Sequence, residues 1–362
     1  MYLKTLRTAK FRNLKEQAVS FTSGVNFIRG KNGEGKTNLL EAIYVLSLSK
    51  SFRTARQSEL IAWGEEEAAV HGVVHDVLND ISLAVGIRKG SRQLFVNDAR
   101  VPSVIEYAGR LVTITFNPSD LALVKGGPAL RRSFLDKHIT DLRPSLMKHF
   151  LSYHKGVAQK SALLQNGTEP ESLDSWNFIL AQSAHHIISE RRNLLRRLEE
   201  RINEDDSRVG ARDGAVGLQL QSNIPDTALE DGWKGIYEFL RSRAGREVQR
   251  RKALYGPHRD EVELTLGGTN ARAYASQGQT RSFVLSMKLA LISLLEEERG
   301  DSPVLLLDDV DSELDRERRT ALFRAVFERP RQVIITGTEY ASAEHQAREG
   351  FQLLSLEDGQ LT

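Results

Sequence analysis

Two hydrophobic patterns divide the chain into three stretches. Residues 1–116 contain short runs that alternate apolar and polar positions, such as residues 2–7 and 81–87, separated by polar turns. A period of two predicts β-strands. From residue 117 to about 253, strand signals almost vanish, and strand character returns at residues 255–266. The pattern therefore predicts α/β sequence on both sides of a helical insertion of roughly 140 residues, a plausible domain size.

The strongest helical pattern lies in residues 176–202, where apolar side chains recur at three- and four-residue steps. Residues 146–164 are expected to form its packing partner. His185 and His186 lie in the longer segment without metal-ligand spacing, so we interpret them as packing or surface residues. Residues 203–223 are polar and contain glycine, which predicts a loop.

The segment from Gly30 to Thr37 has the spacing Gly-x-x-x-x-Gly-Lys-Thr, which is the phosphate-binding P-loop. Its glycines let the backbone approach an anion, and its N–H groups then point at the phosphates. Lys36 is expected to reach the outer phosphates, and the Thr37 hydroxyl to bind Mg²⁺. A predicted strand at residues 25–28 enters the loop and a predicted helix at residues 38–46 leaves it, which is the required order. The candidate nucleotide-binding residues of the loop are Gly30, Lys31, Asn32, Gly33, Glu34, Gly35, Lys36 and Thr37.

Residues 304–309 read as an apolar strand that ends in two acids, Asp308 and Asp309. Ligands bind at this end of parallel strands in α/β sheets. In P-loop nucleotidases a carboxylate here holds Mg²⁺, and a second can orient or deprotonate the attacking water. Apolar strands often end in aspartate, so the pair indicates a nucleotide site only in combination with the P-loop.

Composition narrows the class of protein. The chain has 362 residues, of which 40% are hydrophobic and 27% charged, so we expect a soluble globular protein with two or three folding units. No apolar run approaches the roughly 20 residues of a membrane span. The N-terminus does not resemble a secretion signal, and the absence of cysteine excludes disulfides and thiol chemistry. A cytoplasmic location is expected.

The net charge of +2 does not by itself indicate a nucleic-acid binder, because a whole-chain value hides local patches. Basic residues do cluster. The first cluster has Glu190, Glu199 and Glu200 close by, which suits a solvated helix face with ion pairs, whereas few acids interrupt the second. For both clusters an ion-paired face and a binding surface stay open. The first comprises Arg191, Arg192, Arg196, Arg197 and Arg201, and the second Arg241, Arg243, Arg246, Arg250, Arg251 and Lys252.

With these stretches in view, the chain resembles the ABC-type ATPase heads of the SMC/Rad50 group, and within it the RecF family of bacterial recombination and repair proteins. The motifs run in the family's order over essentially the whole chain: residues 11–14, the P-loop, then residues 276–281, 306–310 and 312–315. The Gly-Pro-His-Arg-Asp of residues 256–260 adds to the likeness. SMC and Rad50 relatives carry a long coiled coil where this chain has a short helical insertion.

The resemblance implies an α/β fold with a parallel core sheet and an antiparallel β subdomain. The ABC-type P-loop ATPase head would comprise residues 1–115 and 255–362. The helical lobe, residues 116–254, would be inserted between the P-loop half and the half with the signature motif and the strand of residues 304–309.

The resemblance also implies roles for single residues around ATP. Asp308 matches the Mg²⁺ ligand. Asp309 matches the catalytic carboxylate, usually glutamate, and its shorter arm predicts slow hydrolysis assisted by Lys36. Arg12 matches an arginine that contacts phosphate, and Asn32 packs beside the phosphates in related heads.

Residues 276–281 match the ABC signature motif, which contacts the γ-phosphate of ATP held by the other subunit. A turn at a helix N-terminus is a reasonable anion site, so ATP would be sandwiched in a homodimer and hydrolysis would release it. The matching residues are Ser276, Gln277, Gly278, Gln279 and Arg281 in the signature, and Ser312 and Asp315 in the D-loop.

Three features depart from the ABC pattern. Gln277 replaces the first glycine of the usual Ser-Gly-Gly-Gln. Residues 111–125 contain no glutamine for a Q-loop. The switch histidine after the last core strand is absent, and Thr336 or Thr338 occupies its region.

The function that the resemblance implies is ATP-dependent DNA binding in recombinational repair and replication. An ATP-bound dimer would bind duplex DNA and gaps or junctions, and would help RecO and RecR to load RecA. Two alternatives stay open, namely an SMC-type scaffold head and a small-molecule P-loop phosphotransferase. DNA binding that is lost on removing ATP would argue against a constitutive scaffold, and activity of an isolated monomer on a small acceptor would favour the phosphotransferase.

Overall fold

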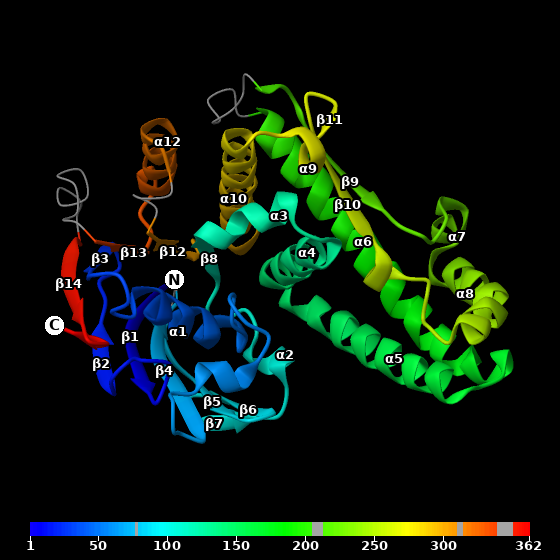
Figure 1. The fold of residues 1–362 in the computed structure, drawn as a ribbon, viewed down its shortest axis with the longest axis horizontal. Coiled ribbons are helices and arrows are strands. Elements are labelled where there is room, and N and C mark those ends of the chain that lie inside the picture. The colour runs from blue at the N-terminus through cyan, green and yellow to red at the C-terminus, as the bar shows by residue number, and fades with distance from the viewer. Residues whose placement is uncertain (77–78, 205–212, 310–313, 339–349) are drawn as a thin grey trace. The chain divides into compact units, whose positions relative to one another are not determined.

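The computed structural model describes residues 1–76, 79–204, 213–309, 314–338 and 350–362, and it divides into two compact units. The first unit comprises residues 1–120 and 288–362, and the second residues 121–287. Figure 1 shows both units in sequence colours. The sequence places residues 255–287 in the ATPase head, whereas in the structure they group with the second unit.

The P-loop strand lies inside a six-stranded sheet of the first unit with the order β15-β14-β3-β13-β12-β8 (Figure 1). Strand β3 (Val25–Arg29) pairs in parallel with β13 (Val333–Gly337), which pairs in parallel with β12 (Val304–Asp308). All residues of β12 and β13 are buried, as continuous apolar runs of a covered parallel sheet should be. The predicted parallel core sheet is confirmed. The remaining strands are β8 (Thr113–Phe116), β14 (Gln352–Glu357) and β15 (Gln360–Leu361).

A second six-stranded sheet of this unit is antiparallel, with the order β2-β1-β4-β5-β6-β7, which confirms the predicted β subdomain. Buried residues alternate with more exposed ones along β4, as the period of two requires. Asn97 and Asp98 have φ of 50° and 62° and connect β6 to β7 as a two-residue hairpin turn. The strands are β1 (Tyr2–Ala9), β2 (Gln17–Ser20), β4 (Glu67–His75), β5 (Asp80–Arg88), β6 (Ser91–Val96) and β7 (Ala99–Val101).

Helix α1 (Lys36–Leu48) lies in the core that the two sheets share. Its apolar side chains, such as Leu39 and Ile43, join one hydrophobic cluster with Leu6 of β1 and Leu306 of β12. This burial fixes the helix that carries the second half of the P-loop. The other helices of the first unit are η1 (Gln57–Leu60), α2 (Val104–Tyr107) and α12 (Arg316–Phe327). Among the described helices none is long and apolar enough to cross a bilayer.

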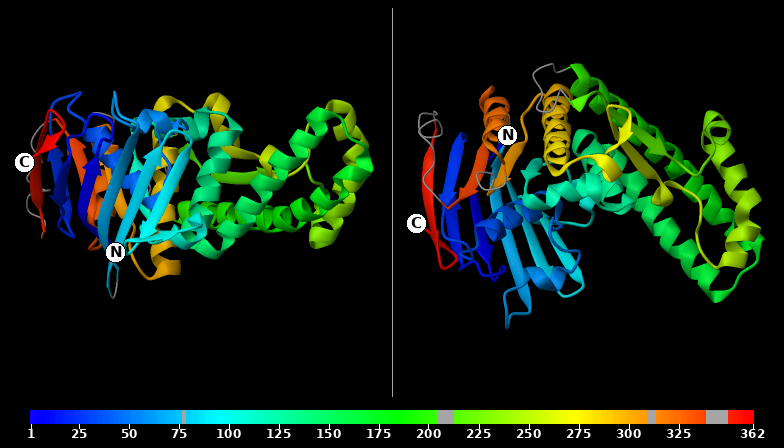
Figure 2. Two further views of the ribbon diagram at one scale, coloured as in Figure 1. Left: turned by 90° about the horizontal axis from the view of Figure 1, so that it is seen from below. Right: turned by 45° about the horizontal axis from the view of Figure 1, so that its top comes forward.

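The second unit is built on α6 (Asp174–Glu204), against which α5 (Met147–Asn166) and α8 (Gly232–Arg250) pack (Figure 2). The two helices predicted from periodicity are confirmed. Helix α10 (Gln277–Arg299) begins in this unit and ends in the first. The other helices are η2 (Pro118–Leu121), which starts at the end of the first unit, and α3 (Ala122–Lys125), α4 (Pro128–Leu142), η3 (Pro144–Leu146), η4 (Pro170–Leu173), α7 (Asp226–Glu230), η6 (Pro257–Arg259) and α9 (Ala271–Tyr274).

The predicted loop over residues 203–223 is wrong at its end, where β9 (Val216–Gln221) forms. This strand pairs antiparallel with β10 (Glu261–Leu266), with Leu218 opposite Leu264, in a three-stranded sheet completed by β11 (Thr269–Asn270). Its outer edge is bound by side chains of α6, because the Asn203 side chain accepts from and donates to the backbone of Val216.

Candidate functional site

The P-loop connects the end of β3 to the first turn of α1, and its glycines are required by the backbone. Gly35 precedes α1 at φ 106°, and a Cβ there would lie 2.8 Å from the side-chain oxygen of Asn13. A Cβ at Gly30 would lie 2.6 Å from the carbonyl oxygen of Leu356. Gly33 also has a positive φ, 91°. Side chains are therefore excluded where the loop must stay close to its neighbours.

Lys36 is held against the loop that it follows. Its Nζ donates hydrogen bonds to the carbonyl oxygens of Gly30 (2.6 Å) and Lys31 (3.0 Å), and burial lowers the pKa of Lys36. The first turn of α1 contains no acidic residue, and no side chain caps its N–H groups. Such a helix start offers donors and a positive dipole end to an anion.

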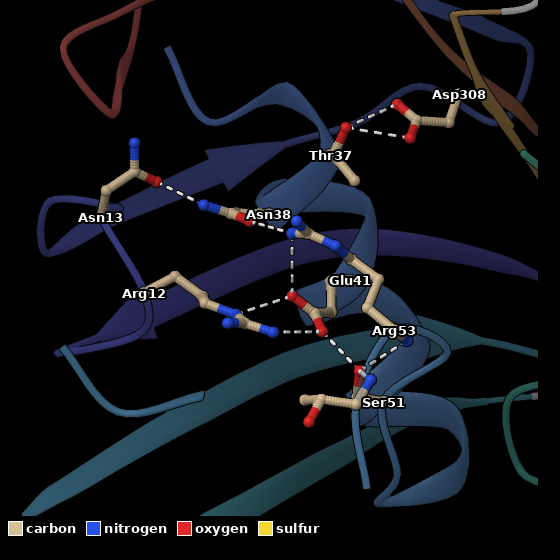
Figure 3. A network of polar contacts seen from close by, with 9 residues as sticks. Arg12, Asn13, Thr37, Asn38, Glu41, Ser51, Arg53 and Asp308 are labelled. Atoms are coloured by element: carbon tan, nitrogen blue, oxygen red, sulfur yellow. Dashed lines mark hydrogen bonds and ion pairs between the residues drawn. The ribbon is translucent and has the colours of Figure 1, made fainter. Parts of the chain in front are cut away.

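The P-loop and the acidic strand end meet at two side chains. Thr37 Oγ1 donates to the carboxylate of Asp308, at 3.0 Å from Oδ1 and 2.9 Å from Oδ2 (Figure 3). Asp308 is buried at the end of β12, and this burial raises its pKa, while hydrogen bonds from Thr336 and Thr37 act in the opposite direction. A hydroxyl and a carboxylate that converge from separate motifs fit the oxygen ligands that Mg²⁺ requires, with phosphate oxygens and water as its further ligands.

Thr336 connects the two acids of this strand end. It lies opposite Asp308 in the β12–β13 register, is fully buried, and its Oγ1 donates to Asp308 Oδ1 at 2.9 Å. The same oxygen accepts the backbone N–H of Asp309 at 3.1 Å. Asp309 has left the strand with φ 50°. Of the two threonines in the region of the switch histidine, Thr336 therefore contacts the site, whereas Thr338 is exposed.

A second polar network lies along α1 (Figure 3). Arg12, at φ 51°, donates from Nε and Nη2 to the two carboxylate oxygens of Glu41, which has no exposed surface. Ser51 Oγ also donates to Glu41, and Arg53 Nη1 lies 3.6 Å from it. Arg12, predicted to contact phosphate, thus points onto a buried carboxylate of the helix that follows the P-loop.

The network continues to the P-loop through two asparagines. Arg53 Nη1 donates to Asn38 Oδ1 (2.7 Å), Asn38 Nδ2 to Asn13 Oδ1 (2.6 Å), and Asn13 Nδ2 to the Gly33 carbonyl (3.3 Å). The sequence reasoning missed Glu41 and Asn13 as members of the site. One signal was present, since Glu41 is a charged residue between apolar neighbours of a helix that had to be buried.

The remaining predicted loop residues lie around the P-loop. Lys31 and Asn32 are exposed, and the Glu34 carbonyl accepts the N–H of Gly359 at 3.1 Å. In the D-loop, Ser312 lies outside the described residues. Asp315 caps α12, where its side chain accepts the N–H of Arg318 at 3.0 Å.

The signature residues lie in the second unit at the start of α10. The Ser276 hydroxyl accepts the N–H of Gln279 (3.1 Å), and the Gln279 side chain accepts the N–H of Ser276 (2.9 Å). This reciprocal pair is a capping box. It fixes the first turn, which contains Gln277 and Gly278, with Arg281 following in the next turn.

Comparison with known proteins identifies the family. A family model for the RecF/RecN/SMC N-terminal domain matches residues 2–359. The DNA replication and repair protein RecF of Trichlorobacter lovleyi is 31% identical, over 100% of this chain and 98% of that protein. The chain belongs to the RecF family. The RecF of Limosilactobacillus reuteri is 34% identical, over 100% of this chain and 98% of its own.

Solved structures agree with the RecF assignment. A structure described as the recombination mediator protein RecF-ATP in the RecFOR pathway has a TM-score of 0.89 at 30% identity, covering 100% of this chain and 97% of that chain. An Smc head bound to the C-terminal winged-helix domain of ScpA has a TM-score of 0.53 at 16% identity, which reflects the shared fold alone. Because the RecF matches span the whole chain, the helical second unit is part of the RecF architecture.

Proposed function

We propose that this RecF-family chain is an ATP-dependent DNA-binding protein of recombinational repair and replication. One observation carries the proposal: the Thr37 hydroxyl and the Asp308 carboxylate meet within 3.0 Å beside the buried Lys36. The strand end and the P-loop therefore form one site whose residue types suit Mg²⁺ and a nucleoside triphosphate. Bound Mg²⁺ would neutralise charge on the phosphates.

Hydrolysis is assigned to Asp309 and Lys36. Asp309 follows the Mg²⁺ ligand and would orient the attacking water, while Lys36 stabilises charge on the outer phosphates. Thr336 fixes the backbone of Asp309 through its hydroxyl. Aspartate reaches one methylene less far than the glutamate usual in ABC proteins, so the proposed turnover is slow.

ATP is proposed to join two copies of the chain. Arg12, Asn32 and the P-loop would bind it on one protomer, and the signature turn from Ser276 would contact its γ-phosphate from the other. The capping box supports this role because it fixes the first turn of α10, and a helix N-terminus is a favourable place for an anion. Hydrolysis would release the dimer, with the D-loop residues Ser312 and Asp315 at its interface.

The proposed target is DNA, in duplex and in gaps or single-strand junctions, with RecO and RecR as partners that load RecA. Support comes from the relatives, which are a DNA replication and repair protein and a recombination mediator of the RecFOR pathway. Binding through phosphate contacts would be sensitive to salt and largely independent of sequence.

The test is a DNA-binding titration with and without ATP and Mg²⁺, across salt, on duplex, single-stranded and gapped DNA. The proposal expects tight binding only with ATP, and preference for duplex-containing substrates. Equal binding with and without ATP would favour the SMC-type scaffold instead. Absence of DNA binding under all conditions would overturn the proposal.

A further inference from the structure

The two basic clusters of the sequence differ in their ion pairing, and this difference points to a binding surface. On α6 three of the five arginines form ion pairs. Arg192 pairs with Asp226 at 2.6 Å and Arg196 with Glu200 at 2.7 Å, while Arg191 is buried. The partners of Arg191 are Asp136 and Asp260, at 2.8 and 3.0 Å. At these three positions the first cluster therefore carries little unbalanced charge.

The second cluster differs. Arg243, Arg246 and Arg250 recur at steps of three and four along α8, which places them on one flank of the helix. Arg251 and Lys252 follow directly, and all five side chains are exposed. No carboxylate of the described residues forms an ion pair with any of these five, which we name the α8 basic face. Arg241 lies on the other flank, 3.7 Å from Asp174.

The helix that carries this face is firmly held along its adjacent, buried flank. Glu247 is fully buried and pairs with the buried Lys160 of α5 at 2.5 Å. The same carboxylate accepts the N–H of Leu254 at 2.8 Å, which ties down the segment after the helix. Arg243 lies over the ring of Phe239, 5.5 Å from its centroid. Arg243, Arg246 and Arg250 are therefore presented by a fixed helix rather than by a loop.

Helix electrostatics alone do not explain the arrangement. Cations stabilise a helix C-terminus only within about the last turn, which accounts for Arg250 and Arg251 but not for Arg243 and Arg246. Grouped cations without anions repel one another. A ligand that supplies a row of negative charges would remove this repulsion. Arg243 to Arg250 span about 10 Å of helix, over which a nucleic-acid backbone offers several phosphates.

We propose that the α8 basic face binds the phosphate backbone of DNA. This rests on the proposed function and gives its DNA binding a surface on the second unit. Arg243, Arg246 and Arg250 make the contacts from the helix flank, and Arg251 and Lys252 extend the row. Contacts of this kind position DNA without reading its sequence.

The experiment uses the full chain with ATP, Mg²⁺ and duplex DNA, titrated at several salt concentrations. The test variant combines Arg243→Gln, Arg246→Gln and Arg250→Gln. The matched control combines Arg88→Gln, Arg192→Gln and Arg196→Gln, three exposed arginines that are ion-paired, so that the change of net charge is equal. The test variant is expected to lose at least about tenfold in affinity, and its salt slope to fall by up to about 3, since each phosphate contact contributes roughly 0.9. The control is expected to bind within about twofold of the parent.

Two further readouts keep the outcome clear. ATP-dependent dimerisation and the midpoint of thermal unfolding should be unchanged in the test variant, and the triple Arg→Lys variant should keep most of the affinity. If the test variant binds DNA like the control while the parent shows ATP-dependent binding, the α8 surface is overturned and the proposed function stands. If the parent does not bind DNA, the proposed function fails with it. Intact DNA binding with lost binding to RecO or RecR would assign the face to a protein partner and overturn the proposal.

Discussion

Arg12 donates two hydrogen bonds, each of 2.9 Å, to the fully buried carboxylate of Glu41. The bonds come from Nε and Nη2, so Nη1 keeps its donors for another acceptor. An arginine fixed in this way would meet a phosphate oxygen without losing its carboxylate. The pair thus connects the turn after β1, the buried helix α1 and the proposed nucleotide in one rigid arrangement.

Glu41→Gln is expected to weaken both the fold and the binding of ATP. The amide would turn an N–H₂ group toward the donors of Arg12 and Ser51, and the guanidinium would lose its counter-charge. Removing one partner of a buried pair costs about 3–5 kcal/mol. Because Arg12 is 18% exposed, we expect a loss of about 2–4 kcal/mol in the free energy of unfolding, measured in urea. Glu67→Gln, in the exposed pair with Arg88, is the control and should leave the free energy of unfolding unchanged. Equal unfolding midpoints for the two variants would contradict this account.

Gly35→Ala tests the crowding behind the P-loop. The new Cβ would lie 2.8 Å from Asn13 Oδ1, in a residue at φ 106°. The clash would shift the P-loop and misplace the N–H groups that bind phosphate, so affinity for ATP should fall at least about tenfold. Gly64→Ala is the matched control, since Gly64 has φ 83° but no atom lies within 4 Å of the position of an added Cβ. It shares the backbone strain without the clash, and ATP binding by calorimetry should be unchanged. A similar loss in both variants would show that strain elsewhere, not crowding at Asn13, controls affinity.

Asp309→Asn should bind ATP and dimerise but fail to turn over. The amide keeps the size of the side chain and tolerates φ 50°, while it cannot act as a base. We expect a fall in the rate of hydrolysis of about a hundredfold or more, with ATP-dependent dimers retained in sedimentation. Lys36→Ala provides the contrast, since it should lose ATP binding and with it the dimer. Normal turnover by Asp309→Asn would show that this residue is not catalytic. ATP-dependent dimers of Lys36→Ala would contradict the proposal that bound ATP holds the two protomers together.

His258 in the second unit should make the fold sensitive to acid. Burial, with Arg259, Lys160 and Arg132 nearby, lowers its pKa from 6.5 to about 4. Its Nδ1 lies 2.7 Å from the Tyr153 hydroxyl, and its Nε2 3.3 Å from the Ala253 carbonyl. As the pH falls, the unfolded chain takes up the proton first. Stability is therefore complete above about pH 6.5 and is lost between pH 6.5 and 4, by about 2–4 kcal/mol.

The measurement is urea unfolding at pH 7.5 and pH 5. His258→Gln should be less stable than the parent at pH 7.5 and should lose less between the two values. His75→Gln replaces a partly exposed histidine of the antiparallel sheet, which lies against Asp80, and serves as control. A parent and a His258→Gln variant with the same difference between pH 7.5 and 5 would contradict the assigned pKa.

The sequence was informative where a feature is carried by consecutive residues. The P-loop, the apolar strand before Asp308 and the period of α6 are local patterns, and each occurs in the structure as predicted. Strand β9 was missed because its partner β10 lies more than forty residues later, and no local pattern shows a pairing at that distance. The role of Thr336 was undecided for a similar reason, since its contact with Asp308 depends on the register of two neighbouring strands.

The charged clusters show the same limit. Counting acids along the chain could not tell a neutralised helix from a free one, because Arg191 and Arg192 find their partners at Asp136, Asp260 and Asp226. Nor did the signature region reveal its boundary, since residues 255–287 read as part of the head although in the structure they group with the second unit. Both the ion pairs and the unit boundary depend on residues that are close in space but distant in sequence.

The left-handed backbone of Asp309 bears on the rate at which such a protein would hydrolyse ATP. Aspartate and asparagine adopt φ near 50° more readily than longer side chains do. Exchange for glutamate would restore the reach of a faster ATPase, but it would place a less tolerant residue in this turn. The geometry after β12 thus favours the short acid, and the lifetime of an ATP-bound state would be set by the shape of a single turn of main chain.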